Sequence, residues 1–352
     1  MIDRRHNQLR LTNGFTLVEL LVALAIVGLL TSIILVGMTG VAENSRVDRT
    51  RAQIARIHSL IAPKWEELHE RRLKLPVFDP RTATDYRVSG GGRELARLRL
   101  DSRRELLSMA LPDRKSDLVD GNFLLTTAPT EWRAMRRKAV RLIANHTGAN
   151  VAGVNSPNAI STFLNTNWSV KHQNAECLYL ILATMVDGDR SALEFFRQDE
   201  IGDADNDGIF EIHDGWGQPV QFLRWAPGLV AAGSYQTVEK PDPSDPLGIY
   251  APFGTFQLFP VIFSGGPDKK LDIRTDAVPE DSTNESARIR YRAPYQLPNG
   301  LQVRNYPYLF LDSSSPINSP TQVLIGGLLD YPADGRDDSG DNIHNHFITT
   351  GR

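Results

Sequence analysis

The first apolar stretch of the chain runs from Phe15 to Gly37 and contains one ionisable side chain, Glu19. A helix of this length is long enough to cross a hydrocarbon layer of about 30 Å. Residues 1–14 hold three arginines against one aspartate, and an excess of basic residues favours the cytoplasmic side. We therefore expect a single transmembrane helix over residues 15–37, with the rest of the chain outside the cytoplasm.

Glu19 separates three interpretations of this segment. A secretory signal peptide should end in a small-residue cleavage site, and the sequence VGMTGVAENS after the apolar run matches one only loosely. A plain signal anchor explains the apolar run and the arginines. It does not explain a carboxylate that costs ~2.5–3.5 kcal/mol near the membrane centre, where acidic residues are usually functional.

The third interpretation rests on Gly14 to Glu19, which read GFTLVE after a short basic leader. This segment resembles the type IV prepilin signature. The resemblance implies that a prepilin peptidase cuts between Gly14 and Phe15 and methylates the new N-terminus at Phe15. It also implies that Glu19 pairs with the terminal ammonium of a neighbouring subunit. Removing one partner of such a buried pair costs ~3–5 kcal/mol.

The partners that the resemblance implies are other pilin or pseudopilin subunits, the prepilin peptidase and a secretion or pilus assembly platform in the inner membrane. Many members of the family have proline at the twenty-second mature position, where this chain has Val36. That departure is compatible with a minor or divergent pseudopilin.

Beyond the apolar stretch, three-and-four spacing predicts an amphipathic helix over residues 38–74. Pro63 should kink this helix or mark a nearby end. Residues 75–198 contain further helical patterns and form an expected helical insert. From residue 199 to 352 apolar runs bounded by Gly, Pro and Asp predict strands, among them QPVQFLRW, FQLFPVIFSGG and PYLFLD. The expected fold is α+β, with the long N-terminal helix packed on an antiparallel sheet. The apolar stripe of the helix comprises Val47, Ile54, Ile57, Leu60, Ile61, Trp65 and Leu68.

Composition and charge argue against some classes of function, nucleic-acid binding above all. The formal net charge is −3, so the chain lacks the overall excess of basic residues that is typical of nucleic-acid-binding proteins. Arginines cluster between residues 93 and 141, and we interpret them as a solvated helix face. The single cysteine, Cys177, lies in an apolar run and should be a buried, inert thiol.

The loop DADNDGIFEIHD, residues 203–214, has the spacing of an EF-hand calcium loop, although a strand pattern follows it and its last position is Asp rather than Glu. Several carboxylates can converge only where a cation offsets their repulsion, so we expect Ca²⁺ here. An acidic turn without a metal is the alternative. The candidate ligands are Asp203, Asp205, Asp207, the carbonyl of Ile209, Glu211 and Asp214.

A second resemblance begins inside this loop. DGWGQPVQFLRWAPG and PVIFSGGPDKKLDI are similar to the β-region of the major pseudopilins of type II secretion, where an Asp-x-Trp-Gly-x-Pro strand leads to a second strand and a calcium loop. The resemblance implies a second metal loop at Gly266, Asp268 and Asp272, with sparser acids than in that family. The matching residues are Asp214, Trp216, Gly217, Pro219, Ser264, Gly265, Gly266 and Asp268.

The last 24 residues combine aspartates with His344 and His346. A His-x-His pair near acids suits zinc, but no third ligand is fixed, so we expect a polar, exposed tail. A weak calcium site in the tail is the other alternative.

No hydrolase elbow, P-loop, zinc-protease helix or dinucleotide fingerprint is found, so we expect no enzyme. The favoured function is a structural subunit of a type II secretion pseudopilus or type IV pilus-like filament. A membrane-tethered, extracytoplasmic ligand-binding module with a prepilin-type anchor is the alternative.

Overall fold

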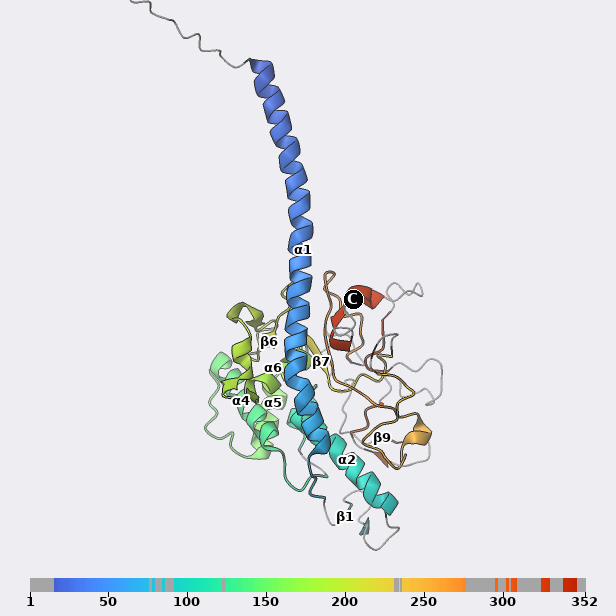
Figure 1. Cartoon of the computed structure of the whole chain (residues 1–352). Coiled ribbons are helices and arrows are strands. Elements are labelled where there is room, and N and C mark those ends of the chain that lie inside the picture. Colours follow the sequence, from blue (N-terminus) through green and yellow to red (C-terminus); the bar gives the residue numbers. More distant parts are fainter. Residues whose placement is uncertain are drawn as a thin grey trace, which may run out of the picture. The chain divides into compact units, whose positions relative to one another are not determined.

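The computed structural model describes residues 16–75, 78–79, 84–85, 92–121, 124–230, 234, 236–276, 295–296, 302–303, 305–308, 324–329 and 338–346. It divides into two compact units, Met1–Arg46 and Val47–Arg352. The helix α1, Leu17–Glu70, contributes to both units and continues through Pro63 (Figure 1). Its end lies four residues before the expected one at residue 74.

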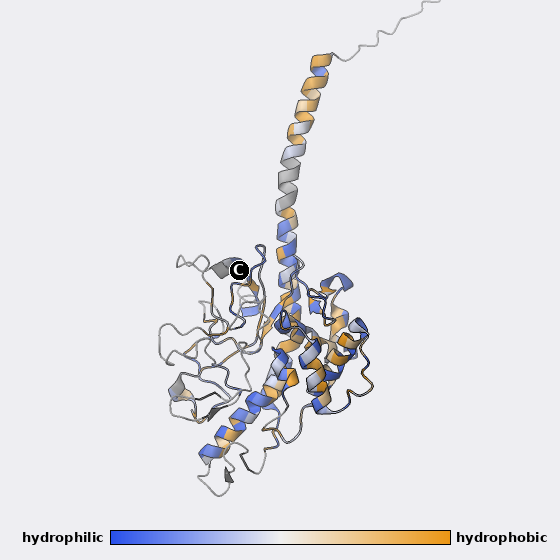
Figure 2. Cartoon of the chain, turned by 180° about the vertical axis from the view of Figure 1, so that it is seen from behind, coloured by the Kyte–Doolittle hydropathy of each residue, from blue (hydrophilic) through white to orange (hydrophobic). Residues whose placement is uncertain are grey.

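In the first unit, α1 carries ten large apolar side chains between Leu17 and Leu30, and all ten are exposed. Figure 2 shows this apolar character along the first turns of the helix. The residues that the structure describes include no helix long and apolar enough to cross a membrane. The span expected over residues 15–37 includes residues 33–39, whose side chains lie outside the described set.

The second unit contains the other helices and all of the described strands. The helices are α2 Gly92–Ala110, α3 Lys115–Val119, α4 Thr130–Thr147, α5 Pro157–Asn167 and α6 Gln173–Thr184. Short 3₁₀ helices are η1 Ala192–Phe195, η2 Gln198–Glu200, η3 Ala251–Phe253 and η5 Asp338–Asp341. The strands are β1 Phe78–Asp79, β2 Thr84–Asp85, β3 Val186–Asp187, β4 Arg190–Ser191, β5 Ile201–Gly202, β6 Glu211–Ile212, β7 Gln221–Leu223, β8 Val261–Ser264, β9 Tyr295–Gln296, β10 Gln302–Val303 and β11 Ile343–His344.

The largest described sheet is antiparallel, with the strand order β11–β8–β7. Phe222 on β7 faces Ile262 on β8 in register, and both side chains are fully buried. The expected strands QPVQFLRW and FQLFPVIFSGG are therefore confirmed as β7 and β8. Most of PYLFLD lies outside the described residues. The fold is α+β, with small antiparallel sheets.

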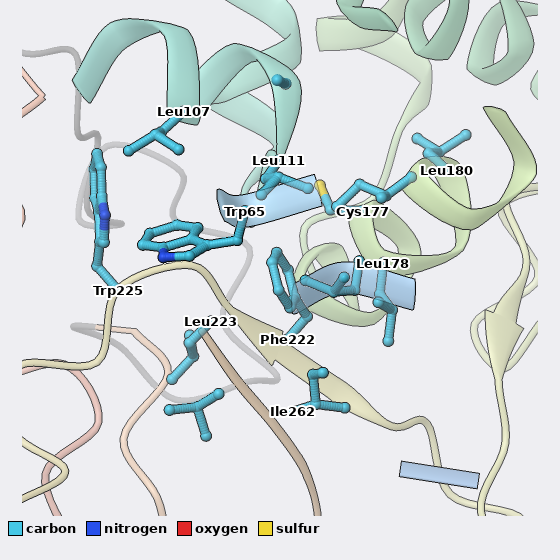
Figure 3. Packing of buried hydrophobic residues seen from close by; sticks show 14 of the residues in the cluster. Trp65, Leu107, Leu111, Cys177, Leu178, Leu180, Phe222, Leu223, Trp225 and Ile262 are labelled. Carbon is cyan, nitrogen blue, oxygen red and sulfur yellow. The ribbon is translucent and has the colours of Figure 1, made fainter. Parts of the chain in front are cut away.

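One hydrophobic core joins the expected helix stripe to the helices and the sheet. Ile54, Ile57 and Leu68 on α1 are fully buried in the same cluster as residues of α2, α6, β7 and β8. Figure 3 shows Trp65 of α1 among Leu107, Leu111 and Phe222. The three-and-four spacing thus marked the packing face of α1 correctly, because a helix buries the side chains that share one face. Cys177 is buried in this core, as expected, and burial raises the pKa of its thiol.

Two expectations about polar residues are confirmed only in part. The solvated arginine face is confirmed only in part: Arg93, Arg99, Arg133, Arg137 and Arg141 are exposed, whereas Arg97, Arg104, Arg114 and Arg136 are at most 7% exposed. The buried guanidiniums fold back onto carboxylates, carbonyls and aromatic rings; that of Arg136, for example, lies 4.3 Å from the Trp132 ring centre.

The expectation of an exposed C-terminal tail is also confirmed only in part, because Gly340 and Asp341 are exposed but the two histidines are not. His344 and His346 are buried, and β11 pairs with β8 through Ile343 and His344. Burial lowers the pKa of His346 to about 3, so its imidazole is neutral at physiological pH. Edge pairing of a short C-terminal strand needs only backbone groups, which the polar composition of the tail did not reveal.

Candidate functional site: an acidic hairpin loop and the N-terminus of α1

The N-terminal candidate residues are partly described. Gly14 and Phe15 lie outside the described residues. Glu19 closes the first turn of α1: its Oε2 accepts hydrogen bonds from the backbone N and from Oγ1 of Thr16, both at 2.8 Å. The Glu19 amide in turn donates to Thr16 Oγ1 at 3.2 Å. This reciprocal pair is a capping box, which satisfies otherwise unpaired amides at a helix start.

The acidic loop 203–214 begins as the turn of a β-hairpin. Strands β5 and β6 pair antiparallel, with Gly202 opposite Glu211, so the loop leaves and re-enters the hairpin at adjacent points. A strand, rather than a helix, follows the loop, as the sequence indicated. The chain then turns once more, through a bridge between His213 and Pro219, towards β7.

Backbone amides fix the shape of this loop. Asp203 accepts hydrogen bonds from the amides of Asp207 at 3.2 Å and Gly208 at 2.9 Å. Gly208 has φ +97°, and a Cβ there would lie 2.6 Å from the Cβ of His146 at the end of α4. Glycine is therefore required twice, by the left-handed backbone and by the close approach to α4.

Two sets of carboxylates meet in this loop and share Asp205. Oxygens of Asp203, Asp205 and Glu211 lie within 4.8 Å of one another. Oxygens of Asp205, Asp207 and Glu176 form the second set, again within 4.8 Å. Four of the predicted ligands therefore converge, and the structure adds Glu176 from the first turn of α6. No sequence motif pointed to Glu176, although a lone carboxylate in an otherwise apolar helix was the available signal.

Of the other two predicted ligands, Asp214 does not join this cluster, and ligation by the Ile209 carbonyl stays a prediction. Asp214 is already occupied: its Oδ1 accepts the amides of Trp216 and Gln218, both at 2.8 Å, and its Oδ2 accepts from Ser264 Oγ at 2.6 Å. Asp214 therefore shapes the Trp216–Gly217 turn and links it to β8. The Ile209 side chain is fully buried in the core, and its amide donates to Asp207 Oδ1 at 2.9 Å.

Three of the five carboxylates have a raised pKa in the folded protein. Burial, together with the charges of Asp207 and Asp205, raises the pKa of Glu176 well above its usual range. Burial also raises the pKa of Asp207 to about 6 and that of Glu211 above its ordinary value. Each shift means that the folded protein disfavours several negative charges at this place.

The two aspartates of the second predicted metal loop lie close together, and a third aspartate from a distant segment joins them. Asp268 and Asp272 approach Asp341 of η5, with oxygens within 4.8 Å of one another. Gly266 has φ +67° and lies against the Asp341 carbonyl, where a Cβ would be 2.4 Å away. Asp268 and Asp341 are exposed, and Lys270 Nζ lies 3.6 Å from Asp268. Solvent and Lys270 therefore already offset this charge.

The second unit also contains a cavity of about 660 Å³, lined in part by α1, α2 and the segment 242–246. Trp65, Leu107 and Trp225 give it an apolar wall (Figure 3). Arg104 and Asp242 add an ion pair at 3.4 Å. An apolar wall with a few oriented charges is typical of ligand pockets.

Comparison with known protein families gives one match: the prokaryotic N-terminal methylation motif, over residues 9–35. The N-terminal segment is therefore prepilin-like. The prepilin-like segment includes Gly14, Phe15 and Glu19, and it implies processing by a prepilin peptidase and assembly with other pilin-like subunits. Neither the curated proteins nor the solved structures provide a match to the chain.

Proposed function

We propose that this chain is a structural, non-enzymatic subunit of a pilin-like filament. It is processed between Gly14 and Phe15, held in the inner membrane by the first part of α1, and assembled through the same segment. The prepilin-like motif over residues 9–35 carries this proposal. The motif combines the cleavage point with the acidic residue that a neighbouring subunit would meet.

The surface of α1 supports the proposal. Ten large apolar side chains between Leu17 and Leu30 are exposed, Leu17 to 79%. Soluble proteins rarely expose contiguous apolar surface of this extent, which marks membrane or protein contacts. Lipid before assembly, and the helices of neighbouring subunits after it, would cover these side chains.

Glu19 has different partners in the two states of this proposal. In the single chain its carboxylate caps α1 through Thr16. In the filament the ammonium created at Phe15 would provide a charged partner from the next subunit. Pairing within an apolar bundle fixes the register between subunits, because a misplaced subunit leaves both charges unpaired.

We further propose that the filament is a secretion pseudopilus. The WGQP segment supports this assignment, since Asp214 holds the Trp216–Gly217 turn and Gly217 adopts φ +77°. The turn delivers the chain to β7, next to β8, the strand order expected from the major pseudopilins.

The test replaces Glu19 in cells that lack any other copy of the chain. Glu19→Val should enter the membrane at least as well as wild type, because a charge penalty of ~2.5–3.5 kcal/mol disappears. It should assemble into sheared or cross-linked fibres poorly. Glu43→Gln, at a second carboxylate of α1, is the matched control and should assemble normally. Normal assembly of Glu19→Val would refute the pairing argument.

The 660 Å³ cavity favours a second candidate, a tethered module that binds a ligand. Thermal unfolding of the purified chain against a panel of sugars and peptides tests it. A ligand that raises the melting temperature of wild type, but not of Trp65→Ala, would establish this function. No shift across the panel would leave the filament subunit as the only candidate.

A further inference from the structure

We propose that Glu176 on α6 and the loop carboxylates Asp203, Asp205, Asp207 and Glu211 together form a calcium site that ties α6 to the β5–β6 hairpin. The carboxylates of this ligand set differ in two places from those of the EF-hand pattern in the sequence. Glu176 enters from a different element, about 30 residues earlier in the chain. Asp214, the twelfth position of the EF-hand pattern, is left out.

The geometry gathers the other four carboxylates next to Asp205, in two sets of three that both include it. One oxygen each from Asp205, Asp207 and Glu176 falls within a 4.8 Å span, and the same holds for Asp203, Asp205 and Glu211. Calcium–oxygen distances are about 2.3–2.6 Å, so oxygens on opposite sides of the ion lie up to about 5 Å apart. The two sets therefore have the spacing of a calcium shell.

Buried oxygens without partners point into the same place. Glu176 and Glu211 are both fully buried, and Oε1 of each has no hydrogen-bond partner. Their other oxygens are used, by Trp168 Nε1 at 2.8 Å and by the Ala204 amide at 2.9 Å. Both oxygens of Asp205 also lack a partner. A buried carboxylate oxygen with no donor is costly, and a cation removes that cost.

The protein supplies little positive charge of its own here. Among the described residues, none of the five carboxylates forms an ion pair with a lysine or arginine. A histidine lies close to one of them: His213 Nε2 is 3.8 Å from Glu211 Oε2. Five carboxylates therefore face one another with no fixed cation. An oxygen-only shell of high negative charge suits calcium, which takes six to eight oxygen ligands in flexible geometry. Magnesium, with its stricter octahedron and shorter bonds, fits such a set less well.

Calcium would couple two parts of the fold. Glu176 sits in the first turn of α6, whose side chains form the centre of the hydrophobic core. The loop residues connect β5 to β6 and lead on towards β7. Binding should therefore stabilise the whole second unit, because a ligand that binds only the folded state shifts the unfolding equilibrium.

The experiment uses the full-length chain in detergent, with calcium chloride or a chelator. Calcium at a hundredfold excess over Kd should raise the melting temperature by roughly 5 °C. Terbium, a luminescent calcium substitute, should be sensitised by Trp168, whose indole hydrogen-bonds Glu176. Calcium should then displace terbium and quench the signal. Equal melting temperatures in calcium and chelator would overturn the proposal.

Three variants locate the site. Glu176→Gln keeps the shape and the acceptor for Trp168 but removes a charged ligand, and should weaken calcium at least about tenfold. Asp214→Asn should keep wild-type affinity even if it unfolds more easily. Asp268→Asn, in the second acidic cluster, should also keep it. Loss of affinity in Asp214→Asn with none in Glu176→Gln would overturn this ligand set in favour of the EF-hand reading.

A stability comparison without metal separates ligation from ordinary packing. In chelator, Glu176→Gln should be at least as stable as wild type, because a neutral amide replaces a fully buried carboxyl group that burial disfavours in its charged form. In calcium, the order should reverse. A variant that is less stable than wild type by the same amount in both conditions would assign Glu176 a purely structural role and contradict the proposal.

Discussion

The buried arginine Arg224 offers a demanding test of how the second unit holds together. It lies at the end of β7 and is fully buried. Its Nη1 donates to Asp117 Oδ2 and to the Leu111 carbonyl, both at 2.7 Å, and its Nη2 lies 3.3 Å from Asp113 Oδ1. Both aspartates are also fully buried. One side chain thus joins the α2–α3 connection to the sheet.

Arg224→Met should cost about 3–5 kcal/mol of unfolding free energy, the usual effect of removing one partner of a buried ion pair. Most of that cost comes from the carboxylates left behind, not from the lost attraction. Burial already raises the pKa of Asp113 to about 6, despite the opposing charges of Arg224 and Arg114. Above that pH Asp113 is charged, and below it the carboxyl takes up a proton. The cost of the substitution should therefore shrink as the pH falls from 8 to 5.

Denaturant unfolding followed by tryptophan fluorescence measures this difference directly. Trp225 is a built-in reporter, because the Arg224 guanidinium lies 4.2 Å from its ring centre. Arg133→Met, at an exposed position of α4, is the matched control and should change stability by less than about 0.5 kcal/mol. A loss below about 1 kcal/mol for Arg224→Met, or a loss that is the same at pH 5 and pH 8, would refute the reasoning.

Two further perturbations test other contacts. Partial burial raises the pKa of Glu131, but hydrogen bonds from Arg71 and Lys64 outweigh this effect and lower the pKa to about 2. The stability contributed by this carboxylate is therefore present above pH 4.5 and lost as the pH falls towards 2, and Glu131→Gln should flatten that part of the pH–stability curve by about 1 kcal/mol. Gly208→Ala should destabilise by about 1–3 kcal/mol in denaturant unfolding, through its positive φ and the clash with His146; a neutral effect would mean that the loop relaxes away from α4.

Periodic apolar patterns predicted the parts of the fold that depend on one element at a time. The α1 stripe and the strands β7 and β8 follow from the spacing of apolar residues, since each pattern reports which face is buried. The burial of three arginines, Arg97 and Arg104 on α2 and Arg136 on α4, did not follow from the sequence pattern. Charge predicts solvent exposure only where no partner is available. Arg104 finds Asp242, and Arg136 finds Pro157 and Ser161, on other segments, while Arg97 pairs with Glu94 of its own helix.

Only the part of the acidic site that lies within one loop could be predicted from the sequence. Asp203, Asp205, Asp207 and Glu211 are close in sequence, so their spacing alone indicated a common site. Glu176 and Asp341 reach their clusters from distant segments, and only the tertiary fold brings them there. Asp214 fitted the spacing but does not join the cluster, because the tight turn at Trp216 uses one of its oxygens and Ser264 uses the other.

The intact mass of the chain extracted from membranes of the producing cell tests the central claim most directly. The account predicts a mature protein that begins at Phe15, with a mass increased by one N-methyl group. Gly14→Val should leave the unprocessed precursor in the membrane. A mature chain that begins beyond Ser32, as ordinary signal-peptidase cleavage would give, would contradict the assignment to a pilin-like filament.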